Sequence, residues 1–119
     1  MFIIPIKKKY FDMIASGEKK EEYREIKPFY TSRLAAKWME NYVGLPYSPD
    51  DKEIFIEWLK EKGTVEFGLI FLRNGYSTKC KTISSECTLR IGTGKTEWGA
   101  ETGKEYYVFG IKDVQKCQE

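Results

Sequence analysis

The second half of the chain has the residue pattern of a β-sheet, and this pattern restricts the possible folds most strongly. From Thr64 onward, runs rich in β-branched and aromatic residues alternate with turn residues. The runs are TVEFGLIFLRNGY, CKTISSECTLRI and EYYVFGIK, and the turns are Asn74–Gly75 and the glycine-rich GTGKTEWGAETG. An Asn-Gly pair between such runs is typical of a β-hairpin. The pattern predicts three or more strands in succession.

The N-terminal part predicts a strand, a short helix and a second strand. FIIPIK (residues 2–7) is an apolar strand, and KYFDMIASG then places apolar residues at helical spacing. Gly17 follows where a left-handed cap is expected at the end of that helix. EEYREI (residues 21–26) alternates loosely and predicts a strand that Pro28 ends.

Two more helices are expected before the sheet-forming half. TSRLAAKWMENYVG predicts a helix capped by Thr31 or Ser32 and stopped by Gly44. KEIFIEWLKEKG predicts another, capped by Asp50 or Asp51. This order of elements indicates an α+β domain whose antiparallel sheet curls into a small barrel.

Composition favours a folded protein of the cytoplasm with no strong overall charge. The chain has 119 residues, 41% of them hydrophobic, enough for one domain with one core. It has no apolar run of membrane-spanning length, and MFIIPIKKKY reverses the charge order of a secretory signal. Because the net charge is only +2, binding of nucleic acid would need a local basic patch.

Cysteine and histidine usage limits the chemistry. Cys80, Cys87 and Cys117 lack Cys-x-x-Cys spacing and are expected to be reduced structural thiols. The chain has no histidine, which excludes Ser-His-Asp and Cys-His catalysis and the common zinc sites. We therefore expect neither a metal nor a cofactor, and an enzyme of this composition would move protons with Lys, Glu, Asp, Tyr or Thr.

The segment GEKKEEYR holds the strongest candidate site. Gly17 allows a sharp turn from helix to strand. On the strand, Glu22 and Arg24 share one face and Tyr23 points to the other. Lys19 can lean over the face of Glu22 and Arg24 from the turn. In a partly dry cleft, burial and Arg24 would lower the pKa of Lys19, whereas Glu22 would raise it.

This cluster has two interpretations. A Lys–Glu–Arg group in a cleft offers donors and one acceptor for a phosphate or a base edge. The same residues on a solvated edge strand would form an ion pair worth only about 0–1 kcal/mol. Arg73 and Trp98, which lie much later in the chain, each have a ligand-binding and a purely structural interpretation as well. Arg73 either contacts phosphate or lies at a solvated hairpin tip, and Trp98 either stacks on a base or closes the end of the barrel.

The spacing G-x-K-x-x-E-x-R, placed after a strand and a short helix, resembles the signature of the ASCH family, small domains named for homology to an activating signal cointegrator. FLRNGY, GTGKTEWGAETGKEYYVFGI and the terminal strand also resemble the small stand-alone ASCH proteins of bacteria and their phages. The resemblance implies one PUA-like β-barrel domain over residues 1–119. It also implies that the helices of about residues 32–62 are an insertion.

The family resemblance implies that the protein binds or modifies nucleic acid. PUA-like barrels bind RNA or modified bases in a cleft beside the barrel, so RNA or a nucleoside or nucleotide is the expected ligand. The expected ligand-binding residues are Lys19, Glu22 and Arg24, with Arg73 and Trp98 as further candidates.

The resemblance is also compatible with an enzymatic activity. Some small ASCH members hydrolyse the acyl amide of N4-acetylcytidine, and others are linked to RNA cleavage. The amidohydrolase type uses the motif lysine, a threonine three residues later and a distant glutamate. Lys19 matches the lysine, but Glu22 stands where the threonine would be. Binding is therefore the first prediction. A hydrolase in which Lys19 moves the proton and Glu22 positions water is the alternative, and an interaction protein with a degenerate cleft is the third possibility.

Overall fold

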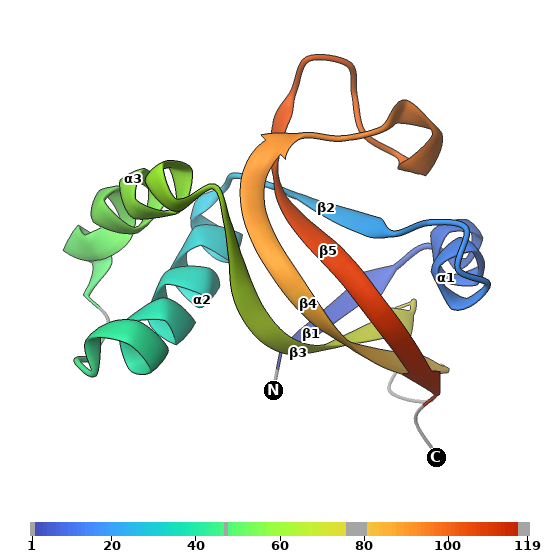
Figure 1. Ribbon diagram of the computed structural model, residues 1–119, viewed down its shortest axis with the longest axis horizontal. Coiled ribbons are helices and arrows are strands. Elements are labelled where there is room, and N and C mark those ends of the chain that lie inside the picture. Colours follow the sequence, from blue (N-terminus) through green and yellow to red (C-terminus); the bar gives the residue numbers. More distant parts are fainter. Residues whose placement is uncertain (1, 47, 76–80, 117–119) are drawn as a thin grey trace.

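The computed structural model describes residues 2–46, 48–75 and 81–116 and has an α+β fold (Figure 1). Within these residues a five-stranded sheet is accompanied by three α-helices. The elements in chain order are β1 (Ile3–Ile6), α1 (Lys8–Ala15), β2 (Glu21–Glu25), α2 (Pro28–Trp38), α3 (Lys52–Lys62), β3 (Thr64–Asn74), β4 (Thr82–Thr93) and β5 (Glu105–Lys116). Single turns of other helix types occupy Met39–Val43, Pro49–Asp51 and Thr96–Trp98.

The sheet is curled into a half barrel and has the strand order β1-β3-β4-β5-β2 (Figure 1). The prediction of an α+β domain with a curled sheet is confirmed. The prediction of a wholly antiparallel sheet is wrong, because β1 pairs with β3 in parallel. The chain between these two strands contains α1, β2, α2 and α3, and such a long crossover allows parallel pairing. β1 and β2 are left as the two edges of the sheet.

The second helix starts earlier than predicted. α2 begins at Pro28, whose ring suits the first helical position, so neither Thr31 nor Ser32 is its cap. Thr31 instead lies buried inside the helix, with its Oγ1 2.6 Å from the hydroxyl oxygen of Tyr107 in β5. This contact with a distant strand outweighs the preference of threonine for a capping position. Gly44 ends the helical segment with φ of 75°, as predicted.

The start of α3 also differs in detail from the prediction. Asp51 lies immediately before the helix, and Asp50 lies in the turn of Pro49–Asp51. The Asp51 carboxylate accepts a hydrogen bond at 3.1 Å from the backbone N–H of Ser48. Asp51 therefore stabilises the turn that leads into the helix.

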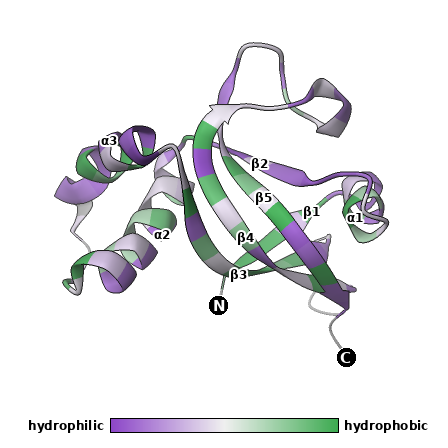
Figure 2. Ribbon diagram, in the orientation of Figure 1, coloured by the Kyte–Doolittle hydropathy of each residue, from purple (hydrophilic) through white to green (hydrophobic). Residues whose placement is uncertain are grey.

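Buried apolar side chains form two clusters. The larger cluster joins the sheet to all three helices, and Figure 2 shows hydrophobic residues along the strands and on parts of the helices. Cys87 belongs to it, and burial raises the pKa of its thiol to about 12. Cys80 and Cys117 lie outside the described residues. The smaller cluster contains Tyr23, Ala100, Tyr106 and Val108. Among the described residues no helix is both long and apolar enough to cross a bilayer.

Candidate active site

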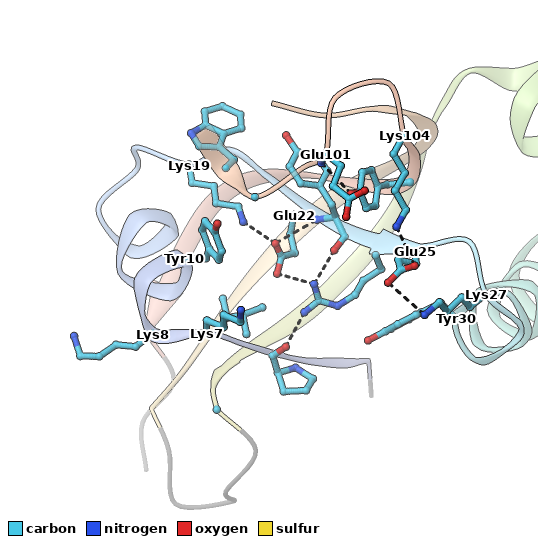
Figure 3. A pocket seen from close by; sticks show the side chains of 18 residues that line it. Lys7, Lys8, Tyr10, Lys19, Glu22, Glu25, Lys27, Tyr30, Glu101 and Lys104 are labelled. Atoms are coloured by element: carbon cyan, nitrogen blue, oxygen red, sulfur yellow. Dashed lines mark hydrogen bonds and ion pairs between the residues drawn. The ribbon is translucent and has the colours of Figure 1, made fainter. Parts of the chain in front are cut away.

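A pocket of about 610 Å³ lies beside the two edge strands of the sheet (Figure 3). Its walls come from β1, the start of α1, most of β2, the start of α2, the loop between β4 and β5 and the start of β5. These segments are far apart in the sequence and meet because the sheet is curled. The G-x-K-x-x-E-x-R motif supplies the inner wall of the pocket.

Lys19 is a buried cation in this wall. The turn after α1 places it: Gly17 adopts φ of 88°, and the Lys19 backbone N–H donates to the Met13 carbonyl at 3.0 Å. The side chain is 1% exposed, and its Nζ lies 2.7 Å from Glu22 Oε1 and 4.1 Å from the centre of the Tyr10 ring. The ammonium thus lies between a carboxylate and an aromatic face.

Glu22 is the centre of the inner charge cluster, which consists of Lys19, Glu22 and Arg24. Its Oε1 accepts hydrogen bonds from Lys19 Nζ and, at 3.2 Å, from the Tyr23 backbone N–H. Its Oε2 lies 3.0 Å from Arg24 Nη1. The predicted convergence of Lys19, Glu22 and Arg24 is confirmed by these contacts.

Burial controls the protonation of Lys19. Loss of hydration lowers the pKa of the Lys19 ammonium, and the positive charge of Arg24 lowers it further. The charge and hydrogen bond of Glu22 oppose both effects but do not cancel them. The sequence predicted these opposing effects and left their net direction open. The lowered pKa makes Lys19 a better proton donor than an exposed lysine.

Arg24 connects the two edges of the sheet. Its Nη2 donates to the Pro5 carbonyl in β1 at 2.7 Å, and its Nη1 donates to the Tyr23 carbonyl in β2 at 2.7 Å. The side chain is only 17% exposed. Arg24 was predicted to bind ligand, but these donors are already used within the protein. We infer that Arg24 holds the wall of the pocket in shape.

A second charge cluster lies at the pocket rim, and it consists of Lys27, Glu25 and Lys104. The Glu25 carboxylate lies 3.3 Å from Lys27 Nζ and 3.1 Å from Lys104 Nζ. The hydrogen bond from Lys104, followed by that from Lys27, lowers the pKa of Glu25. The same hydrogen bond with Glu25 raises the pKa of Lys104. The contact between Glu25 and Lys104 in this outer charge cluster therefore favours the charged form of both groups.

Among the described residues, five aromatic side chains also line the pocket, namely Tyr10, Tyr23, Tyr30, Trp98 and Tyr106. Tyr23 was predicted to point away from Glu22 and Arg24 into the core. It is buried against Tyr106 in the smaller cluster, but it also lines the same pocket, with its ring centre 5.7 Å from Lys19 Nζ. Burial raises the pKa of Tyr23. Trp98 contacts the same cluster, and Lys95 Nζ lies 4.4 Å from the centre of its ring.

The loop that carries Trp98 is attached to the pocket at three points. The Lys95 backbone N–H donates to the Tyr23 hydroxyl, and the Glu101 backbone N–H donates to the Tyr106 hydroxyl, both at 3.0 Å. Gly99 packs on Tyr10 so closely that a Cβ atom would lie 2.9 Å from the ring, and its φ is 101°. A glycine is required there for both reasons. The loop is therefore a fixed wall of the pocket.

The structure places four of the five predicted site residues at this pocket, namely Lys19, Glu22, Arg24 and Trp98. Arg73 is not among its lining residues in the described part of the chain. It lies opposite Pro5 in the ladder between β1 and β3.

Sequence reasoning missed several lining residues, among them Tyr10, Glu25, Lys27, Tyr30 and Lys104. The alternation of charges after the motif was a signal for Glu25 and Lys27. Tyr10, Tyr30 and Lys104 reach the pocket through folding, and their local sequence does not indicate it. Within the described residues, no group of three or more His, Cys, Asp or Glu side chains is placed to hold a metal ion.

Comparison of the chain with protein-family models, with curated proteins and with solved structures gives no match. The chemistry of the pocket is therefore the basis for a functional assignment.

Proposed function

We propose that the pocket binds one nucleoside unit, either within RNA or as a free modified nucleoside, and that the chain is an ASCH domain with a PUA-like barrel. The buried Lys19–Glu22 ion pair at 2.7 Å carries this proposal. Removing two charges from water is costly, so such a pair is weak evidence for a role in stability. Ionisable groups perturbed by burial and a charged partner, in a cleft, are typical of functional sites.

The size and the walls of the pocket suit a nucleoside. Pockets for small molecules commonly have volumes of about 300–1,000 Å³. Aromatic rings stack on bases of any sequence, and Trp98 is the largest ring available here. Among the described residues, the hydroxyls of Tyr10 and Tyr30 have no hydrogen-bond partner, so they are available to donate to or accept from a base edge. These features support binding in the pocket and stacking on Trp98.

Calorimetric titration at low salt tests the proposal. The probes are adenosine, cytidine, guanosine, uridine, N4-acetylcytidine and a short single-stranded RNA. We expect Trp98→Ala to weaken binding by about 1–3 kcal/mol, because it removes a stacking surface. Tyr42→Ala is the matched control, since Tyr42 is an exposed aromatic residue outside the lining of the pocket. Failure of every probe to bind would refute the proposal, and equal losses in both variants would refute the role of Trp98.

A hydrolase is the second candidate, and the lowered pKa of Lys19 next to a carboxylate favours it. Glu22 would position a water molecule for attack on the acyl carbon of N4-acetylcytidine, and Lys19 would transfer a proton to the departing amine. The Glu22 oxygens, however, already accept from Lys19, Arg24 and the Tyr23 backbone. We therefore expect slow release of cytidine or none. Fast release that is lost in Lys19→Ala would establish the hydrolase, and Glu22→Thr tests whether a hydroxyl raises the rate.

A further inference from the structure

The pocket holds the excess positive charge of the protein. Its lining contains six basic side chains and three carboxylates among the described residues, a formal charge of +3, whereas the whole chain carries +2. The basic residues are Lys7, Lys8, Lys19, Arg24, Lys27 and Lys104. A concave surface with one sign of charge concentrates ligands of the opposite sign. A neutral nucleoside would make no use of this charge.

The positive charge of the inner cluster is poorly accessible to an anion. Lys19 is almost completely buried, and Arg24 donates to the carbonyls of Tyr23 and Pro5. The excess charge that a ligand can reach is therefore at the rim.

The outer charge cluster is accessible and carries a net formal charge of +1. Lys27 and Lys104 share one carboxylate, Glu25, and their side chains are 62% and 36% exposed. A lysine ammonium has three N–H donors, so each retains donors after contacting Glu25. Lys104 Nζ also lies 5.4 Å from the centre of the Tyr106 ring, which joins this cluster to the aromatic wall. Figure 3 shows Lys104, Glu25 and Lys27 together on one side of the pocket, with Lys7 and Lys8 on the other.

We infer that Lys27 and Lys104 bind the phosphate of a nucleotide whose base lies against the aromatic wall. The ligand class is then a phosphate-bearing nucleotide, either free or within an RNA chain, instead of a neutral nucleoside. This inference rests on the proposed function and specifies its ligand. Glu25 holds the two ammonium groups near one another, and a phosphate oxygen that contacts both completes the arrangement with charge-assisted hydrogen bonds.

The experiment compares the four ribonucleosides with their 5′-monophosphates by calorimetry at low salt. We expect each nucleotide that binds to do so about tenfold more tightly than its nucleoside, an advantage kept modest by solvent exposure of the lysines. Lys27→Gln and Lys104→Gln should each reduce the advantage, and the double variant should remove it. Lys112→Gln is the matched control, because Lys112 pairs with Glu66 at 2.6 Å outside the pocket lining.

The outcomes separate this inference from the proposed function. Equal affinity of nucleosides and monophosphates would overturn the phosphate site and leave the proposed function intact. An advantage that survives in the Lys27→Gln/Lys104→Gln double variant but disappears in Lys7→Gln would overturn its location. Failure of all eight probes, together with the RNA, would reject the proposed function itself. A dinucleotide is tested in the same way. If its affinity exceeds that of the nucleoside by as much as the affinity of the monophosphate does, the result supports a site for RNA. If only the monophosphate binds more tightly than the nucleoside, the result supports a site for free nucleotides.

Discussion

Two charge clusters each hold one glutamate of β2 between two basic side chains, in different surroundings. In the inner cluster Glu22 lies between Lys19 and Arg24, and in the outer cluster Glu25 lies between Lys27 and Lys104. All four ion-pair distances are between 2.7 and 3.3 Å. The Glu22 side chain is 5% exposed, whereas the Glu25 side chain is 43% exposed. Distance alone therefore does not distinguish the two clusters.

The lysines of the two clusters show what burial changes. The pKa of Lys19 is lowered, because loss of hydration outweighs the attraction of Glu22. The pKa of Lys104 is raised, because its hydrogen bond with Glu25 outweighs a smaller loss of hydration. A neighbouring glutamate thus favours the charged lysine in both clusters, but burial outweighs this effect only for Lys19. The inner cluster is suited to proton chemistry or base contacts, and the outer cluster is suited to holding an anion.

The largest expected effect comes from neutralising each carboxylate in turn. Glu22→Gln should lower the free energy of unfolding by about 3–5 kcal/mol, because it leaves Lys19 and Arg24 without a buried counter-charge. Glu25→Gln should leave the urea midpoint nearly unchanged, because water solvates Lys27 and Lys104. Urea unfolding of both variants checks this. Equal shifts would remove the distinction between the clusters.

A second substitution sharpens this test. Adding Lys19→Met to Glu22→Gln removes the unpaired ammonium and should recover part of the lost stability. If the loss of stability in the double variant equals the sum of the losses in the two single variants, the unpaired charge of Lys19 is not the cause of the destabilisation in Glu22→Gln.

The next largest effect concerns Arg24, which the outer cluster does not match. Arg24→Gln should lower the free energy of unfolding by about 1–3 kcal/mol, because it removes charge-assisted hydrogen bonds to β1 and β2. Arg90→Gln is the matched control. Arg90 also contacts a glutamate and a backbone carbonyl, Glu21 Oε2 at 3.1 Å and Thr93 O at 3.3 Å, but it is more exposed. Amide hydrogen exchange should speed up in β1 only in Arg24→Gln, and unchanged exchange there would contradict the connection.

The smallest expected effect is a difference in pH dependence. The folded-state pKa of Lys19 lies below its ordinary value of 10.5, so the unfolded chain binds this proton more tightly and stability rises with pH between the two values. Lys104 behaves in the opposite way, because its contribution is present below 10.5 and is lost as pH rises through its raised pKa.

Urea unfolding from neutral pH to above 10.5 measures this difference. The stability of the parent relative to Lys19→Met should increase with pH up to 10.5, and relative to Lys104→Met it should decrease above 10.5. Tyr23 and Cys87 have raised pKa values and also affect stability at high pH, but both variants retain them. Parallel curves for the parent and Lys19→Met would contradict the lowered pKa of Lys19.

The inner cluster was predictable because its geometry is local. Lys19 and Glu22 are three residues apart across one turn, and strand alternation places Glu22 and Arg24 on one face. The outer cluster was not predictable in full, because Lys104 reaches Glu25 across 79 positions of the chain. No local pattern specifies such a contact.

The fold shows the same division between local and distant information. The sequence predicted α1, β2 and the strands after Thr64 from periodicity and turn residues. It misplaced the start of α2, where Thr31 contacts Tyr107, and it missed the parallel pairing of β1 with β3. Both errors concern partners brought close by tertiary structure, which can override local preference.

The contact between Arg24 and Pro5 has a consequence for association between molecules. Exposed edge strands can recruit strands of other chains and start aggregation. At Pro5, β1 presents a residue without an N–H, and the carbonyl of that residue already accepts from Arg24. This part of the edge therefore offers little to an incoming strand. The side chain that shapes the pocket thus also occupies a backbone acceptor that an incoming strand would need at this point of β1.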